Sequence, residues 1–187
     1  MKYFFGFLIS IGLVILVFIM IMRGFSGGGT DKPTQKPLSD YANTSSVVRF
    51  TMSGPIVGDQ QFKSYQITVG RDQTFIETRQ GYEATPIDSR TYMNNTESYT
   101  NFLRALDFAG FARGDEDSPN KDERGTCAKG HRFIMQIKDG SSDKQRFWTT
   151  DCGGQGNFGG NVEEVRRLFN MQVPPADFSK LVNPLRI

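Results

Sequence analysis

Very few residues in this sequence combine the type and the spacing that catalysis or metal binding requires. Cys127 is followed closely by His131, the single histidine of the chain, and Asp151 directly precedes Cys152. A thiol beside an imidazole is the arrangement of a cysteine nucleophile, but an active thiol also needs an electropositive niche that a sequence does not show. Zinc usually takes about four cysteine, histidine or carboxylate ligands. Two cysteines and a single histidine therefore give little support for a zinc site. We therefore predict no catalytic residue, no metal site and no cofactor.

The glycine-rich segment GGQGNFGG is the other candidate for ligand chemistry. Backbone amides ahead of a helix can hold a phosphate, and a helix is expected to follow this segment. The phosphate-loop pattern, however, requires a Gly-Lys-Ser/Thr ending that is missing here, and the dinucleotide pattern requires a βαβ context. We interpret the segment as a tight loop, and as the place where a small ligand would bind if the domain takes one. The candidate ligand residues are Gly153, Gly154, Gly156, Gly159, Gly160 and Asn161.

The two cysteines flank a predicted β-hairpin almost symmetrically. The hairpin has an Asp-Gly turn at 139–140 between strands 131–138 and 144–150, and Asp-Gly is a strong turn signal. If these two residues are the centre of the turn, the register places Cys127 opposite Cys152. Two reduced core cysteines are the alternative. We predict a structural disulfide, which would stabilise the fold by about 3 kcal/mol through loop-closure entropy.

The rest of the domain supplies the elements that position these residues. Apolar and polar residues alternate over several short segments that are separated by glycine- and proline-containing turns, which indicates antiparallel strands. The predicted strands before the hairpin cover residues 47–52, 62–69, 74–80 and 87–93. The short joins between them favour a four-strand meander.

Two segments change from the strand period to the helical period. The first begins at Asn94, with Glu97 at capping-box spacing, and ends at Gly110. The second begins at Asn161 and is ended by the prolines at 174–175. The residues after these prolines are expected to dock as a tail, either extended or with one short helical turn. The predicted fold is α+β: an antiparallel sheet, formed by the meander and the hairpin, with two main helices packed on one face.

The N-terminal segment Tyr3–Met22 carries no formal charge and lies between Lys2 and Arg23. A helix of this length crosses the hydrocarbon core of a bilayer, which is roughly 30 Å thick. A cleaved signal peptide is the alternative, but its apolar region is shorter, about 7–15 residues, and small residues follow it. We predict a single transmembrane anchor over residues 1–23, which contacts the lipid bilayer through residues 3–22.

The composition changes twice after the anchor. Residues 24–45 are rich in glycine, serine, threonine and proline, which predicts a flexible linker. Residues 46–187 have the length of one soluble domain. Basic and acidic side chains are equal in number from Ser46 onward, so the domain has no concentrated cationic surface and we predict no nucleic-acid partner.

The predicted disulfide also bears on location. Disulfides persist outside the reducing cytosol, so we expect a cytoplasmic N-terminus and an extracytoplasmic domain in a single-pass membrane protein. We expect this domain to be a non-enzymatic binding or structural module of the cell envelope, with an envelope protein or polymer as its partner. The alternative is an envelope enzyme with a site around residues 127–160 that uses His131, Asp151 or the glycine-rich loop. A lipid or polymer sensor, the third hypothesis, requires a deep apolar pocket.

Overall fold

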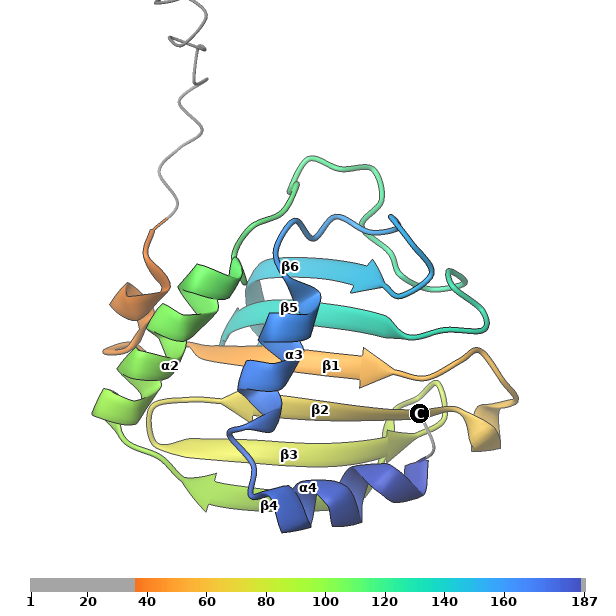
Figure 1. Cartoon of the computed structure of the whole chain (residues 1–187), viewed down its shortest axis with the longest axis horizontal. Coiled ribbons are helices and arrows are strands. Elements are labelled where there is room, and N and C mark those ends of the chain that lie inside the picture. The colour runs from red at the N-terminus through yellow and green to blue at the C-terminus, as the bar shows by residue number, and fades with distance from the viewer. Residues whose placement is uncertain (1–35, 186–187) are drawn as a thin grey trace, which may run out of the picture. The chain divides into compact units, whose positions relative to one another are not determined.

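The alternating segment Val47–Ser53 forms β1, a central strand of the sheet in the computed structural model (Figure 1). The structure describes residues 36–185, so the predicted membrane anchor and much of the predicted linker lie outside the described residues. Between residues 36 and 185, no helix combines the length and the apolar character needed to cross a membrane.

Six antiparallel strands pair in the order β4-β3-β2-β1-β5-β6. The remaining strands are β2 (Lys63–Val69), β3 (Gln73–Gln80), β4 (Thr85–Met93), β5 (Arg132–Asp139) and β6 (Ser142–Thr150). The predicted meander and the predicted hairpin are both confirmed. They form one sheet because β1 pairs with β2 on one side and with β5 on the other.

The β5–β6 hairpin differs from the predicted register. Its two turn residues are Gly140 and Ser141, and Asp139 pairs with Ser142. Gly140 has a φ of +59°, which glycine adopts without strain and which suits the first central position of a type II′ turn. The predicted Asp-Gly centre at 139–140 is therefore wrong by one residue, and a β-bulge further along the hairpin shifts the pairing again.

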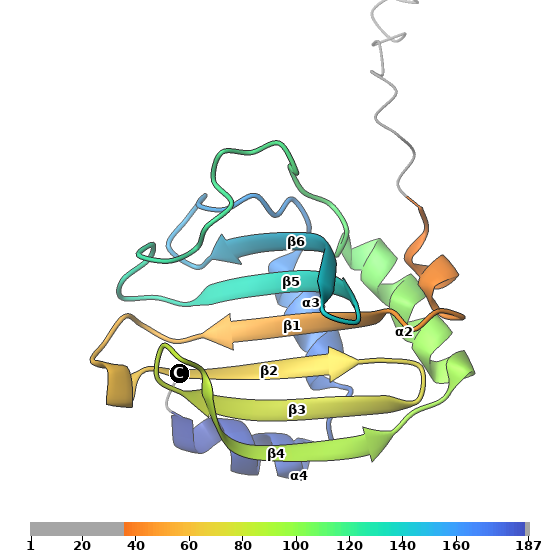
Figure 2. The same ribbon diagram turned by 180° about the vertical axis from the view of Figure 1, so that it is seen from behind.

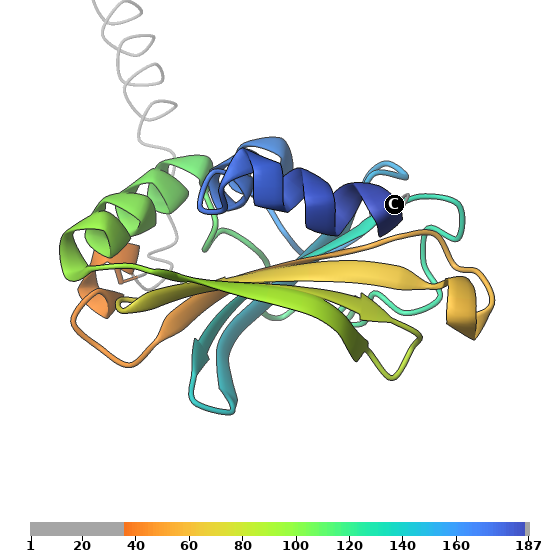
Figure 3. The ribbon, with the colours of Figure 1, turned by 90° about the horizontal axis from the view of Figure 1, so that it is seen from below.

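Three helices cover one face of the sheet (Figure 3). They are α2 (Thr96–Ala109), α3 (Val162–Asn170) and α4 (Pro175–Val182). The two predicted helices are present, and α4 is a third helix where the sequence predicts a docked tail with at most one short helical turn. Proline is well suited to the first position of a helix, because the amide that it lacks has no partner there and its φ is already helical. Pro175 therefore begins α4, whereas α3 already ends at Asn170.

The ends of α2 follow local capping chemistry. The side-chain oxygen of Asn95 accepts a hydrogen bond from the Ser98 amide at 2.9 Å, whereas the Asn94 side chain donates to a carbonyl of the β2–β3 turn at 2.8 Å. The predicted cap at Asn94, with Glu97 in a capping box, is therefore wrong by one residue. The predicted C-cap is confirmed, since Gly110 has the left-handed φ of +75°.

Aromatic rings fill the layer between the sheet and the helices. Phe169 of α3 is fully buried, and the centroid of its ring lies 5.5 Å from that of Phe50 in β1. The corresponding distances to Phe102 of α2 and to Phe111 are 5.1 and 5.7 Å. One ring thus connects α3 with the sheet and with α2, and aromatic pairs at such distances add to the free energy gained by burial.

The folded unit extends to Lys36, before the predicted domain boundary near Ser46. A 3₁₀ turn, Leu38–Tyr41, packs against α2, and Leu38 is fully buried. The Leu38 amide donates a hydrogen bond to the Asp107 carboxylate at 2.9 Å. Burial raises the pKa of this carboxyl, although the hydrogen bond opposes the shift. Residues 36–45, which composition assigns to the linker, thus include packed structure.

The second face of the sheet has a different character. Figure 2 shows this face from the front, and no helix of residues 36–185 lies over it. We call it the open face. Its side chains come from the alternate positions of each strand, and most of them are polar.

Candidate functional site

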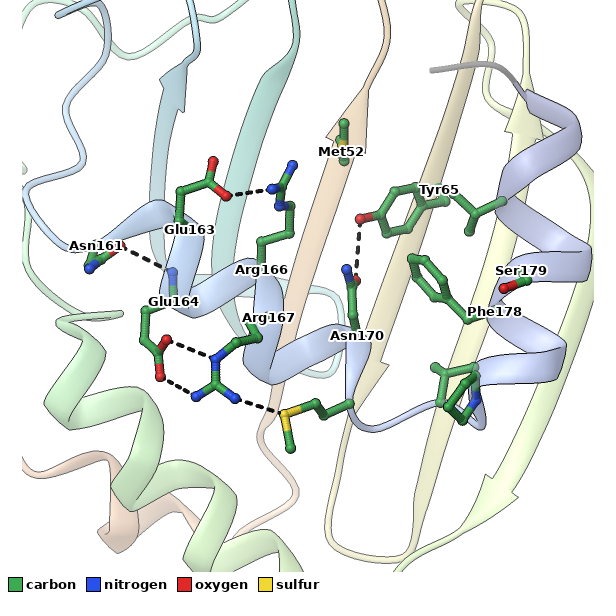
Figure 4. Close-up of a pocket in the computed structure, with 14 residues that line it drawn as sticks. Met52, Tyr65, Asn161, Glu163, Glu164, Arg166, Arg167, Asn170, Phe178 and Ser179 are labelled. Carbon is green, nitrogen blue, oxygen red and sulfur yellow. Dashed lines mark hydrogen bonds and ion pairs between the residues drawn. The ribbon is translucent and has the colours of Figure 1, made fainter.

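A groove of about 960 Å³ lies along α3 and α4 on the helix-covered face (Figure 4). Its floor contains Met52 of β1 and Tyr65 of β2, which are 6% and 1% exposed. Phe178 and Val182 of α4 form part of its wall. We call this feature the α3–α4 groove.

The local sequence explains the position of the floor. Strand alternation turns Met52 toward the helices, and Tyr65 is its direct partner across the β1–β2 pair. After α3, buried Val173 fixes the chain on the sheet and Pro175 starts α4. Figure 4 shows Tyr65 between the two helices.

Polar groups border the apolar floor. The Tyr65 hydroxyl donates a hydrogen bond to the Asn170 side-chain oxygen at 3.3 Å. Burial raises the pKa of Tyr65 to about 12, so the phenol is neutral at physiological pH. The amide of Asn170 and this hydroxyl provide hydrogen-bonding groups at the edge of the floor. Groups of this kind orient ligands in binding sites.

The rim of the groove carries balanced charges on α3. Glu163 pairs with Arg166, and Glu164 pairs with Arg167 at the i,i+3 spacing. The Arg167 guanidinium lowers the pKa of the Glu164 carboxyl by hydrogen bonding. Because each carboxylate has an arginine partner, the rim has no net charge, and the groove suits an apolar group without a formal charge.

The sequence did not predict a groove at these residues. The α3 pattern predicts a core stripe and a polar outer face, and the segment with Phe178 and Val182 predicts a docked tail. The groove depends on the packing of α3 and α4 against β1 and β2, which are distant in the chain. The Pro-Pro pair at 174–175 is the one local signal for a second helix, because proline begins helices as well as ending them.

The structure brings together the residues that the sequence singled out for chemistry. Cys127 and Cys152 form the predicted disulfide, with a Cα–Cα distance of 5.6 Å. Asp151 lies beside it: one carboxylate oxygen lies 2.5 Å from Nδ1 of His131, and the other accepts the His131 backbone amide at 2.7 Å. Burial of Asp151 opposes its ionisation, but the hydrogen bonds and the charge of His131 together hold the pKa of Asp151 below its usual value.

This cluster has a clear structural role. The ligand atoms of Cys127, Asp151 and Cys152 lie within 4.8 Å of one another, but both sulfurs are part of the disulfide and neither is a thiolate. A Cβ added to Gly130 would lie 2.2 Å from a carboxylate oxygen of Asp151. The disulfide, the carboxylate and the imidazole together fix the loop before β5 to the end of β6.

The glycine-rich loop is also tightly packed. A Cβ on Gly156 would lie 2.2 Å from the carbonyl oxygen of Trp148, and one on Gly160 would lie 2.3 Å from that of Gly110. Gly159 donates its amide to a backbone carbonyl at 2.9 Å, whereas Gly153 and Gly154 have open space around them. These glycines allow the close backbone approaches of the loop.

Asn161 connects this loop to the α3–α4 groove. Its side-chain oxygen accepts the Glu164 amide at 3.1 Å, which confirms the predicted start of α3. Asn161 also lines the groove. Among the predicted ligand residues, it is the one that belongs to the lining of the groove.

Comparisons of the sequence with known proteins return no match, either to a protein-family model or to a curated protein.

Proposed function

We propose that this chain is a single-pass membrane protein whose extracytoplasmic domain is a non-enzymatic binding module, and that it binds an apolar segment of an envelope protein in the α3–α4 groove. The observation that carries the proposal is a groove whose lining includes exposed apolar side chains, such as Met171 and Pro175, and whose rim has no net charge. Such a site gains free energy from apolar burial, at roughly 25 cal/mol per Å², and its few polar groups orient the ligand.

The predicted anchor and the disulfide support the proposed location. The apolar segment Tyr3–Met22 has the length of a membrane span, and disulfides persist outside the cytosol. After reduction, a membrane-impermeant maleimide should label Cys127 and Cys152 on intact cells. Labelling that requires lysis would reverse the proposed topology.

The groove proposal is tested by filling the groove. Ser179 is exposed and lines it, whereas the neighbouring Lys180 is exposed on α4 outside the lining. Ser179→Trp should therefore block the site, and Lys180→Trp is the matched control. After chemical cross-linking in intact cells, we expect the same discrete partner with the unaltered chain and with K180W, and its loss with S179W. Recovery of the same partner with all three chains would contradict the proposal.

The His131–Asp151 contact favours a second candidate, an envelope enzyme with a site in residues 127–160. A carboxylate that orients an imidazole is part of many hydrolytic sites. Among residues 36–185, however, Asp151 is the one hydrogen-bond partner of the His131 ring, and the nearby sulfurs are bonded to each other. The double variant H131A/D151N separates the candidates: partner binding should persist if the chain is a binding module, and loss of its cellular activity with the partner still bound would favour the enzyme.

A further inference from the structure

The open face carries several cationic side chains, and most of them already have partners. Arg79 pairs with Glu77, and the Lys138 ammonium lies 2.7 Å from the Asp143 carboxylate. On β6, the guanidinium of Arg146 pairs with a glutamate of the loop before β5. The buried Arg132 guanidinium donates to two backbone carbonyls of neighbouring loops.

Arg49 differs from these cations. It lies on β1 near the middle of the sheet and is partly buried. Its one side-chain hydrogen bond runs from Nε to the Thr68 hydroxyl at 3.3 Å. No carboxylate of residues 36–185 forms an ion pair with it. Burial and the nearby charge of Arg79 lower the pKa of Arg49, whereas the charges of Asp143 and Glu77 oppose this shift.

The residues directly opposite Arg49 on the two neighbouring strands are uncharged hydrogen-bonding side chains. Thr68 on β2 and Gln136 on β5 are its direct cross-strand partners. Thr51 is the next residue of β1 on this face, and its partner is Gln66. The Arg49 guanidinium therefore has hydroxyl and amide side chains beside it, on a sheet face that no described helix covers (Figure 2).

We propose that the open face binds an extended acidic segment of a partner protein, with a carboxylate of that segment on the Arg49 guanidinium. A guanidinium matches a carboxylate in a planar, two-bond geometry, and charge-assisted hydrogen bonds are roughly twice as strong as neutral ones. The charge complements the occupant: Arg49 has no acidic partner among residues 36–185 and, unlike Arg132, is not enclosed by backbone carbonyls, whereas the acids Glu77 and Asp143 are already paired.

This surface is separate from the α3–α4 groove, because the two features lie on opposite faces of the sheet. The proposal therefore stands even if the groove has another function. The probe is fluorescein-labelled hexaglutamate, titrated against the full chain in nanodiscs of zwitterionic lipid with fluorescence anisotropy as the readout. The test variant is Arg49→Gln. The matched control is Arg104→Gln, which removes the same charge from an exposed position on α2 in the helix layer.

We expect saturable binding to the unaltered chain, a loss of about tenfold or more in affinity for R49Q, and a change within about twofold for R104Q. Arg49→Lys keeps the charge without the two-bond geometry, so its affinity should fall between those of R49Q and the unaltered chain. It also provides the test if R49Q fails to fold.

Equal affinities of R49Q and the unaltered chain would overturn the proposal, as would the absence of saturable binding. Equal losses for R49Q and R104Q would show that only net charge attracts the probe. Displacement of the probe by inorganic phosphate at lower concentrations than by unlabelled hexaglutamate would identify a small-oxoanion site, and would also overturn the proposal.

Discussion

The two faces of the sheet differ in what holds them together. On the helix-covered face, aromatic and aliphatic side chains are buried beneath α2, α3 and α4, and the α3–α4 groove leaves part of this apolar surface accessible. On the open face, polar side chains are arranged in hydrogen bonds and ion pairs, with Arg49 lacking an acidic partner among the described residues. Antiparallel sheets often have one face packed and one face solvated. The difference teaches that most of the buried apolar side chains lie on the helix-covered face, whereas Trp148 of β6 is buried on the open face, where its indole N–H donates to a carbonyl of the loop before β5.

The same substitution on each face should give the largest contrast. Phe169→Ala removes a fully buried ring that contacts three other aromatic rings, and should cost about 3–5 kcal/mol of unfolding free energy. Phe75 is partly buried on the open face, opposite Thr68, so Phe75→Ala should cost about 1 kcal/mol. Urea unfolding measures both values. Equal losses of unfolding free energy in the two variants would contradict the difference between the two faces.

The disulfide should contribute the next largest effect, independently of either face. Replacing Cys127 and Cys152 by serine opens a covalent loop with a sequence separation of 25 residues. Loop-closure entropy predicts a loss of about 3 kcal/mol. Urea unfolding of the double variant, beside the oxidised parent, gives the number. A loss below about 1 kcal/mol would mean that the loop is held mainly by its non-covalent contacts, such as the His131–Asp151 pair.

The glycine-rich loop offers a smaller and sharper test. Gly160→Ala places a Cβ against a backbone carbonyl and a ring carbon of Phe158, and should cost about 2–3 kcal/mol through steric overlap. Gly154→Ala meets open space at a φ of +74°, so only backbone strain of about 1 kcal/mol is expected. If thermal unfolding shows equal losses, the packing role of this loop is contradicted.

The smallest effect should come from Asp151, because its side chain is 41% exposed and solvent screens its interactions. Its folded-state pKa lies below the unfolded value of about 3.9, so the stabilisation is complete above that pH and is lost as the pH falls through the folded pKa. Asp151→Asn should therefore lose well under about 1 kcal/mol at neutral pH. The variant and its parent should converge in stability under acid. Urea titrations across the acidic range check the sign, and a difference that grows toward low pH would contradict it.

Local patterns predicted most of the elements, and non-local packing produced the rest. The alternation of β1 and the apolar stripe of α2 are visible in the sequence because each depends on neighbours a few positions away. The pairing of β1 with β5 could not be predicted from the sequence, since no local signal specifies which strands pair across a long connection. The α3–α4 groove requires that Met52 and Tyr65 meet two helices from the far end of the chain. That Arg49 lies opposite uncharged residues depends on the register of β1 with β2 and β5. Register is difficult to predict from the sequence, and the predicted register of the β5–β6 hairpin was wrong by one residue.

A photoreactive benzophenone side chain at Ser179 tests the central claim most directly. In the full chain on intact cells, irradiation should join the α3–α4 groove to one discrete envelope protein. The same group at Lys180, one residue outside the groove lining, should give little of this product. Mass spectrometry of the adducts identifies the partner. Equal yields from both positions, or adducts with lipid alone from Ser179, would contradict the account of the groove as a protein-binding site.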